Sequence, residues 1–324
     1  MNAPTARDDR PDLSVVVVNW NTLGLLREAL ASVFGGLGAL RAEVFVVDNG
    51  STDGSAEMVR REFPAAILIA NADNRGFAPA NNQALALARG RHVLLFNSDA
   101  FALGDVLERT VRYLDAHPEV GAMGCRVLNP DRTVQLTCFR DPTLVNLALM
   151  ASGAHRLAWP KFLGRPQYRG WDRRDERDVD VVTGCYLAVR GEVLAQVGPL
   201  DDAFFLYGEE TDWCLRIRRA GWAVRLAPVG EIVHHGSASA WRCNHRRDLM
   251  LTSGIVRWHR KHRGVVSAAA AYALLFLFNA TRAAFWSVRA LFSRDARVKR
   301  RRDHFAGVVA GYGAAWPRLA EVRS

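Results

Sequence analysis

The first hundred residues alternate short apolar runs with segments of helical periodicity. The apolar runs are residues 13–18, 43–47, 66–70 and 92–96. The first run is β-branched and unbroken, which is typical of a strand buried on both faces of a sheet. Apolar residues at helical spacing follow it and end at Gly35 and Gly36, and further helical segments separate the remaining runs. Four βα units in a row predict an α/β fold with a mostly parallel sheet flanked by helices.

The pattern changes after residue 128. Residues 129–178 lack sustained periodicity and scatter proline and tryptophan, so we expect a long surface segment with one short helix near 144–150. Regular patterns then return. They predict strands at 179–189 and 222–226, and helices at 192–197 and 211–220. The polar first residues, 1–11, are expected to be a disordered N-terminus.

The positive charge of the chain is concentrated at its C-terminal end. Residues 241–324 carry 17 basic and 4 acidic residues, whereas residues 1–240 carry 26 basic and 29 acidic ones. This asymmetry indicates an anionic partner for the tail, either a membrane surface or a nucleic acid. The 5 cysteines form no CxxC pair, which argues against a zinc knuckle or a disulfide framework and fits a reducing cytosol.

The tail contains one long uncharged stretch, residues 265–281. As a helix it would be roughly 26 Å long, short of the ~30 Å hydrocarbon core, and Arg282 and Arg289 interrupt any extension. Aromatic residues recur every seven positions, at Phe278, Phe285 and Phe292. A cluster of basic residues follows, which predicts a helix lying in a membrane interface. A core helix packed on the body and a spanning helix are the alternatives.

Polar residues follow three of the four predicted strands. They are Asn19-Trp20-Asn21, Asp48-Asn49-Gly50 and Asn97-Ser98-Asp99. Ligands bind beyond the carboxyl ends of the strands in an open parallel sheet, so the three clusters predict one site, although a single strand-end Asp is more often a helix cap. No GxGxxG or GxxxxGK[ST] follows the first strand, which argues against a dinucleotide site and an ATPase. A hard divalent cation held by Asp99 would then neutralise the phosphates of a ligand.

Six motifs occur in order between residues 12 and 240. They are VVVNWN at 16–21, VVDNGSTDG at 46–54, NRGFA at 74–78 with NN at 81–82, LFNSD at 95–99, YGEETDWCLR at 207–216 and HHG at 234–236. Together they resemble the family 2 glycosyltransferases of the GT-A fold, and most closely the bacterial rhamnosyltransferase-type members that build polysaccharides. The resemblance implies a GT-A catalytic domain over 12–240, with a nucleotide-sugar half at 12–128 and an acceptor half at 129–240. A basic, helical, membrane-associating segment would follow at 241–324.

The resemblance implies a role for each matching residue. Asp48 would bind the pyrimidine base of a dTDP- or UDP-sugar, with the backbone near Val18 and Asn19 beside the nucleotide. Asp99 and His234 would hold Mg²⁺ or Mn²⁺ on the donor diphosphate, where a cation acts as a Lewis acid. The other residues expected to bind the nucleotide sugar are Asn21, Asn74, Arg75, Gly76, Asn81, Asn97 and Ser98.

Three carboxylates, Glu209, Glu210 and Asp212, lie where a helix is expected to begin. Acidic residues interact favourably with a helix N-terminus, by ~0.3–1 kcal/mol each, which explains one or two of them. The resemblance makes Glu210 the general base of an inverting transfer, and we expect the helix start to keep it ionised. Asp212 belongs to the same catalytic site but lies about 200° from Glu210 around the helix, so we expect it to brace the site or cap the helix.

Two positions depart from the family pattern. Asn97 stands where the DxD element has its first Asp, which leaves one carboxylate, and Glu210 stands where Asp is more usual. A sugar-nucleotide nucleotidyltransferase would need a Gly-rich basic loop after the first strand, and Asn19-Trp20-Asn21-Thr22 is not one.

A nucleic-acid-binding protein would need aromatic stacking motifs and a basic body, neither of which is present. We therefore expect transfer of a sugar, with rhamnose one candidate, from a nucleoside-diphosphate donor to a hydroxyl of a lipid-linked or polysaccharide acceptor. The enzyme is expected in the cytoplasm, bound peripherally to an anionic membrane at the inner face of the plasma membrane, with no nucleic-acid partner.

Overall fold

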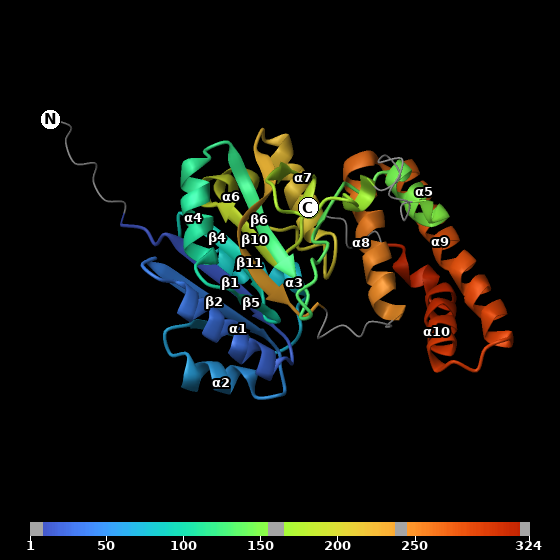
Figure 1. The fold of residues 1–324 in the computed structure, drawn as a ribbon, viewed down its shortest axis with the longest axis horizontal. Coiled ribbons are helices and arrows are strands. Elements are labelled where there is room, and N and C mark those ends of the chain that lie inside the picture. The colour runs from blue at the N-terminus through green and yellow to red at the C-terminus, as the bar shows by residue number, and fades with distance from the viewer. Residues whose placement is uncertain (1–8, 155–164, 237–244, 318–324) are drawn as a thin grey trace.

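One mixed sheet of nine strands forms the centre of the computed structural model, which describes residues 9–154, 165–236 and 245–317. The strands lie in the order β3-β2-β1-β4-β10-β6-β11-β5, and β8 pairs with β11. The expected GT-A-like α/β architecture is therefore present, with helices on both sides of the sheet (Figure 1). The disordered N-terminus predicted for 1–11 lies almost entirely outside the described residues.

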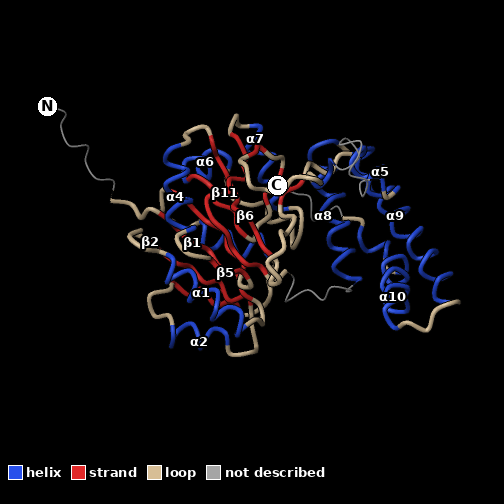
Figure 2. The backbone as a smooth tube through the Cα atoms, viewed as in Figure 1, coloured by secondary structure: helices blue, strands red, loops and turns tan. Residues whose placement is uncertain are grey.

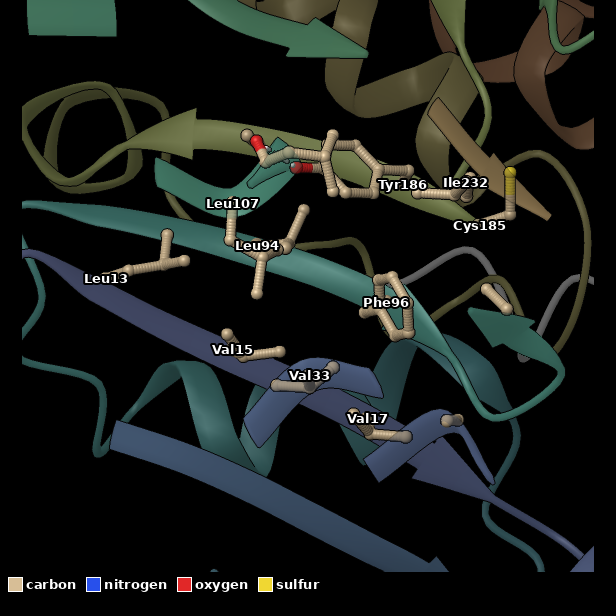
Figure 3. Close-up of a cluster of buried hydrophobic side chains, with 14 of the residues drawn as sticks. Leu13, Val15, Val17, Val33, Leu94, Phe96, Leu107, Cys185, Tyr186 and Ile232 are labelled. Atoms are coloured by element: carbon tan, nitrogen blue, oxygen red, sulfur yellow. Dashed lines mark hydrogen bonds between the residues drawn. The ribbon is translucent and has the colours of Figure 1, made fainter. Parts of the chain in front are cut away.

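The four predicted N-terminal strands are all present and mutually parallel. They are β1 (Leu13–Asn19), β2 (Ala42–Asn49), β3 (Ile67–Asn71) and β4 (His92–Asn97). Three helices connect them, namely α1 (Leu23–Gly36), α2 (Ser55–Glu62) and α3 (Phe77–Leu85). In Figure 3, Val15 and Val17 of β1 and Val33 of α1 lie in one apolar cluster with Phe96 and Tyr186. The sheet thus buries apolar side chains on both of its faces, as the unbroken β-branched run of β1 predicted.

The second half of the sheet contains antiparallel pairs. β10 (Tyr186–Arg190) runs antiparallel to β4 and to β6 (Val120–Leu128). β11 (Ala223–His234) runs parallel to β6 and antiparallel to the short strands β5 (Ala100–Ala102) and β8 (Arg177–Asp178). The helices of this half are α4 (Val106–Ala116), α6 (Gly191–Val197) and α7 (Glu209–Arg219). α7 and the end of β11 carry the motifs at 207–216 and 234–236, which lie at the same edge of the sheet as the motifs after β1, β2 and β4.

Several predicted elements differ from the observed ones. The strand expected at 179–189 is two strands, because β9 (Val181–Val182) pairs with β7 (Cys138–Phe139) in a separate sheet. β6 was not predicted, since Gly121, Gly124 and Arg126 interrupt its apolar pattern. The side chain of Trp222 fills the space beside Gly121, where a Cβ atom would lie 2.5 Å from the Trp222 Cβ.

The segment expected on the surface, 129–178, is in part buried. Its predicted helix is present as α5 (Leu144–Ser152), and a 3-10 turn follows at Arg165–Gln167. Tyr168, Trp171 and Arg173 are buried, however, and the Arg173 guanidinium donates to the Gln167 carbonyl at 3.0 Å. The expectation of a surface segment is wrong here, because a buried arginine and aromatic side chains supply a core that has no periodic pattern.

Three helices form the C-terminal layer, namely α8 (His245–Arg263), α9 (Val265–Leu291) and α10 (Ala296–Ala310), before a 3-10 turn at Tyr312–Ala315. Figures 1 and 2 show α8 between the sheet and the pair α9 and α10. α9 continues through Arg282 and Arg289, contrary to expectation, and its 27 residues span roughly 40 Å. Arg282 is accommodated because its guanidinium donates to the Ala151 carbonyl of α5 at 3.3 Å. In the described part of the chain α9 is the one helix long and apolar enough to cross a membrane.

A buried ion cluster joins α8 to α7. The carboxylate of Asp212 accepts hydrogen bonds from Arg216 at 2.8 Å and from His262 at 2.7 Å, and Lys261 Nζ lies 2.8 Å from it. Burial alone would raise the pKa of Asp212, but the hydrogen bonds from His262 and Lys261 hold this pKa at about 2. The C-terminal layer is therefore fixed to the sheet domain through one carboxylate that is not exposed to solvent.

We predict that Asp212→Asn lowers the free energy of unfolding by about 3 kcal/mol, because it removes the charge of a fully buried carboxylate that pairs with Arg216, Lys261 and His262. Since the pKa of Asp212 is depressed, this stabilisation is present above pH ~4 and is lost as the pH falls toward 2. Urea denaturation at pH 7 measures the change. The control is Asp105→Asn, which breaks a half-exposed pair with Arg109 and should change the free energy of unfolding far less. Equal losses in the two variants would contradict the anchoring role of Asp212.

Candidate active site

The ends of β1 and β2 are joined by hydrogen bonds between predicted site residues. Asn19 pairs with Asp48 in the register of the two strands, and its amide nitrogen donates to Asp48 Oδ1 at 3.0 Å. The other carboxylate oxygen of Asp48 accepts from the backbone N–H of Ser51 at 3.1 Å. Val18, the residue before Asn19, is half-buried at the same strand end. Asp48 is thus held in one orientation at the rim of the sheet.

A second set of contacts joins β1 to the end of β4. Asn21 adopts a left-handed conformation with φ of 53°, and its Oδ1 accepts from the Thr52 N–H at 2.8 Å. The Thr22 hydroxyl donates to Asn19 Oδ1 at 2.6 Å and lies 3.0 Å from Ser98 Oγ. The structure therefore brings together Val18, Asn19, Asn21, Asp48 and Ser98, as the sequence predicted.

Asn49 organises the third predicted group. Its amide nitrogen donates to Asn74 Oδ1 at 2.9 Å, and its Oδ1 accepts from the Arg75 N–H at 3.1 Å. Gly76 has a φ of 91°, and a Cβ atom there would collide with the Phe205 carbonyl. The loop of Asn74, Arg75 and Gly76 is thereby held against the loop that leads to α7.

Asn81 is the one predicted nucleotide-sugar residue that the structure does not bring to this rim. Its side chain is buried within α3, and its amide nitrogen donates to the Phe77 carbonyl at 2.8 Å. The neighbouring Asn82 instead fixes the following loop, since its amide exchanges hydrogen bonds with the backbone of Leu200 at 2.8 and 3.1 Å.

Asp99 and His234, predicted as metal ligands, lie side by side. Asp99 comes two residues after the end of β4, and antiparallel pairing of β5 with β11 sets Ala100 opposite His234. The distance between Asp99 Oδ1 and His234 Nε2 is 3.2 Å, and both side chains are largely buried. Asn97, at the end of β4, contacts the same Nε2 atom at 3.2 Å.

Gln135 orients the His234 ring. Its Nε2 donates to Asn129 Oδ1 at 2.8 Å and to the His234 carbonyl at 3.2 Å, so its Oε1 faces His234 Nδ1 at 2.7 Å. Nδ1 must then carry the proton, so the Nε2 lone pair accepts a hydrogen bond from the Asn97 amide nitrogen and lies beside the Asp99 carboxylate. Two acceptors facing each other at this distance fit a shared divalent cation.

The described residues contain no group of three or more His, Cys, Asp and Glu side chains arranged to hold a metal ion. Asp99 and His234 would therefore supply two of the ligands, and oxygens from a bound substrate or water would have to supply the remainder. Such a site is suited to a cation that binds together with phosphate groups.

Glu209 and Glu210 begin α7 beside this pair. Glu209 is buried and Glu210 is half-buried, and each has one buried carboxylate oxygen without a hydrogen-bond partner among the described residues. Burial raises the pKa of the Cys185 thiol to about 12, and the charges of Asp99 and Glu210 add smaller increases, so both carboxylates act on this one side chain, whose backbone carbonyl accepts from the Asn97 N–H at 3.3 Å. The predicted metal ligand Asp99 and the predicted base Glu210 thus act on the same buried thiol.

Burial raises the pKa of Glu210, although backbone hydrogen bonds at Glu210 and Gly208 oppose the shift. Burial and the charge of Glu210 likewise raise the pKa of Glu209. The backbone hydrogen bonds at the helix start favour the charged form, as expected, but the effect of burial is larger. A carboxylate with a raised pKa holds a proton more strongly, which suits a general base working near neutral pH.

Asp212 has the structural position that the helical geometry predicted. Its carboxylate is fully buried and bound to α8, so it supports the helix that carries Glu210 and does not reach the rim. Gln135 and Asn49 were not among the predicted site residues. Gln135 lies in the segment without periodicity and Asn49 within a recognised motif, and only the three-dimensional contacts reveal what each amide orients.

Comparison with known proteins identifies the family of the chain. Residues 14–195 match the sequence profile of the family described as Glycosyl transferase family 2. An N-acetylglucosaminyl-diphospho-decaprenol L-rhamnosyltransferase of Mycobacterium tuberculosis is 28% identical over 71% of this chain and 78% of that protein. The O-antigen biosynthesis protein RfbC of Myxococcus xanthus is 25% identical over 71% of this chain but only 18% of its own length.

Two solved structures share the fold. A mannosyltransferase of Pyrobaculum calidifontis in complex with GDP-Man and Mn²⁺ gives a TM-score of 0.55 at 20% identity, covering 95% of this chain and 86% of that one. GalNAc-T7 with UDP, GalNAc and Mn²⁺ gives 0.56 at 13% identity, covering 94% of this chain and 56% of that one. The fold is thus that of GT-A glycosyltransferases. Because the family match covers more than half of the chain and includes the rim of β1, β2 and β4, this protein is a member of glycosyl transferase family 2.

Proposed function

We propose that this glycosyltransferase is inverting and metal-dependent, and that it moves a sugar from a nucleoside-diphosphate donor to a hydroxyl of a lipid-linked glycan in cell-surface glycan synthesis. One observation carries the proposal: the Asp99–His234 pair and the half-buried Glu210 carboxylate lie at the same end of the sheet. The Asp99–His234 pair can hold a cation at a diphosphate, and Glu210 can accept a proton.

The donor would lie along the ends of β1, β2 and β4. Asp48 and Asn19 are oriented by each other, which supports a role in reading the base and ribose of a dTDP- or UDP-sugar. The related solved structures contain GDP-Man in one case and UDP in the other, so the fold accepts more than one nucleotide. Rhamnose is the candidate sugar, because the Mycobacterium tuberculosis relative is named a rhamnosyltransferase.

Asp99 and His234 would hold the divalent cation. A cation bound there offsets the negative charge that builds on the departing diphosphate. A carboxylate with a neutral imidazole suits Mn²⁺ better than Mg²⁺, and both related structures contain Mn²⁺. Gln135 would act through His234 by keeping its Nε2 free of a proton.

Glu210 would take the proton of the acceptor hydroxyl. In an inverting transfer the hydroxyl oxygen bonds to the anomeric carbon while the bond to the diphosphate breaks, and the proton passes to the base. The raised pKa of Glu210 supports this role, provided that the carboxyl has lost its proton before each turnover. Asp212 would hold α7 in position without contacting either substrate.

The C-terminal layer would attach the enzyme to an anionic membrane surface. The outer face of α9 exposes large apolar side chains over its whole length, among them Val266, Leu277, Phe285 and Leu291. Basic residues follow at the start of α10, which supports a helix lying flat on anionic lipid. The proposed domain organisation is a catalytic domain at 12–240 and a membrane-associating segment at 241–324. The sugar would then be transferred to the acceptor at the cytoplasmic face of the plasma membrane.

We predict that Asp99→Asn abolishes the gain in UDP affinity that Mn²⁺ produces, while the fold is kept. Gln135→Leu should weaken Mn²⁺ binding about 10–100-fold, as expected for a residue that orients a ligand. Calorimetric titration of UDP with and without Mn²⁺ measures both effects. Asp105→Asn, remote from the rim, is the control. A Mn²⁺-dependent affinity that survives in Asp99→Asn would remove this carboxylate from the site.

We also predict that the double variant Phe285→Asp with Leu291→Asp binds anionic vesicles at least ~10-fold more weakly than the unaltered protein, because two large apolar contacts are lost. Co-sedimentation with vesicles containing phosphatidylglycerol measures this, and high salt should also reduce binding. Leu87→Asp changes a leucine of the sheet domain that is as exposed as Phe285 and serves as the control. Equal sedimentation of all three proteins, or equal binding to neutral vesicles, would argue against the interfacial arrangement.

A further inference from the structure

A cavity of about 670 Å³ lies between the sheet domain and the C-terminal layer. The loop at 202–207 forms one wall, α8 forms another, and the 3-10 turn at Tyr312–Ala315 with the residues after it closes the third. Arg75 is the one residue of the predicted donor site that lines this cavity. The cavity therefore adjoins the rim without including Asp48, Asp99 or His234.

The charged side chains that line the cavity are mostly basic. They are Arg75, Arg246, Arg257 and Asp202. Arg257 is buried, with its guanidinium 5.9 Å from the centre of the Phe204 ring, while the Asp202 carboxylate accepts from Asn82 at 2.5 Å. Guanidinium groups bind phosphate oxygens with two parallel hydrogen bonds, so the cavity suits an anion carrying several such oxygens.

The remaining wall is apolar. Leu249 and Met250 of α8 and the aromatic residues Phe205 and Trp316 contribute to it, and half of the Phe205 side chain is exposed. Flexible thioether and planar aromatic surfaces accommodate apolar chains of irregular shape. A ligand that joins a phosphate group to a hydrocarbon would use both parts of the lining, whereas a free nucleotide would use only one.

The wall of the cavity ends three residues before the proposed base in the chain. Its wall ends at Tyr207, and Gly208 and α7 with Glu210 follow directly in the chain. On its other side, the Phe205 carbonyl accepts from the Phe77 N–H at 2.7 Å, which holds the donor loop at Gly76 in place. A molecule bound here would contact Arg75 of the donor loop and the segment that leads into α7.

We propose that this cavity binds the diphosphate and the first hydrocarbon units of a lipid-linked glycosyl diphosphate acceptor, with Arg246 and Arg257 as the phosphate ligands. The inference rests on the proposed function, because it assigns the acceptor of that same reaction. The donor also carries a diphosphate, but the residues suited to that group, Asp99 and His234, do not line the cavity.

The test compares two diphosphates on the full-length protein. Farnesyl diphosphate in detergent probes the cavity, and UDP with Mn²⁺ probes the donor site. Arg246→Ala changes an exposed residue and should fold normally, and Arg257→Gln removes the buried charge. Each variant should weaken farnesyl diphosphate binding by ~10–100-fold, the range expected for hydrogen bonds to a charged group. Binding of UDP should change less than ~2-fold, and Arg89→Ala, an exposed arginine that does not line the cavity, should change neither.

Three results would overturn the proposal: unchanged farnesyl diphosphate binding in Arg246→Ala and Arg257→Gln, equal binding of farnesol by the unaltered protein, or an equal loss of UDP affinity. The last would assign the cavity to the donor. Hydrolysis of nucleotide sugars by the same preparations reports on the proposed function separately. Failure there, with diphosphate binding intact, would refute the proposed function and leave the anion site. If the preparations hydrolyse nucleotide sugars but bind farnesyl diphosphate and farnesol equally well, only the assignment of the cavity to the acceptor is refuted.

Discussion

The close approach of α8 to the loop before α7 is the contact on which the rest of the site depends. Gly254 of α8 meets the carbonyl of Tyr207, and any Cβ atom at position 254 would collide with it. Gly208, in a left-handed conformation, lies against Phe204 and Gly254 on the other side. Only glycine permits two backbones to pack this closely. Asp212 also holds this junction together by its contacts with Lys261 and His262. The C-terminal layer is therefore packed against the catalytic domain as part of one structure.

This junction accounts for the electrostatics of the site. It removes water from the start of α7, where burial raises the pKa of Glu209 and of Glu210 against the opposing effect of the backbone hydrogen bonds. Asp212, three residues beyond Glu209 on the same helix, has its pKa held at about 2 because basic side chains surround it. Carboxylates on one helix thus acquire opposite properties from their surroundings. One is suited to proton transfer and the other to holding two layers together.

The sequence predicted the four parallel strands, the residues at their ends and the family, because buried strands and strand-end motifs are local patterns. It also predicted that Glu210 and Asp212 have different roles, since residues two apart on a helix point in different directions. It did not predict β6, whose glycines and arginine break the apolar pattern, or the burial of Arg173. Nor could it assign Gln135 to the ring of His234, or reveal that burial outweighs the helix start at Glu210. These features arise from contacts between residues far apart in the chain, such as the pairing that sets Ala100 opposite His234.

The central claim is that a half-buried Glu210 takes the acceptor proton, and the pH dependence of kcat tests it most directly. Activity requires the ionised carboxylate, so the rate should fall as the pH drops through a pKa above 4.5, the ordinary value, because burial raises it. Glu210→Gln should lower kcat at least ~100-fold and abolish this acidic limb, while the affinity for UDP with Mn²⁺ stays nearly constant. If Glu210→Gln kept most of its turnover and the acidic limb, while Asp212→Asn lost them, the two roles assigned to α7 would be reversed.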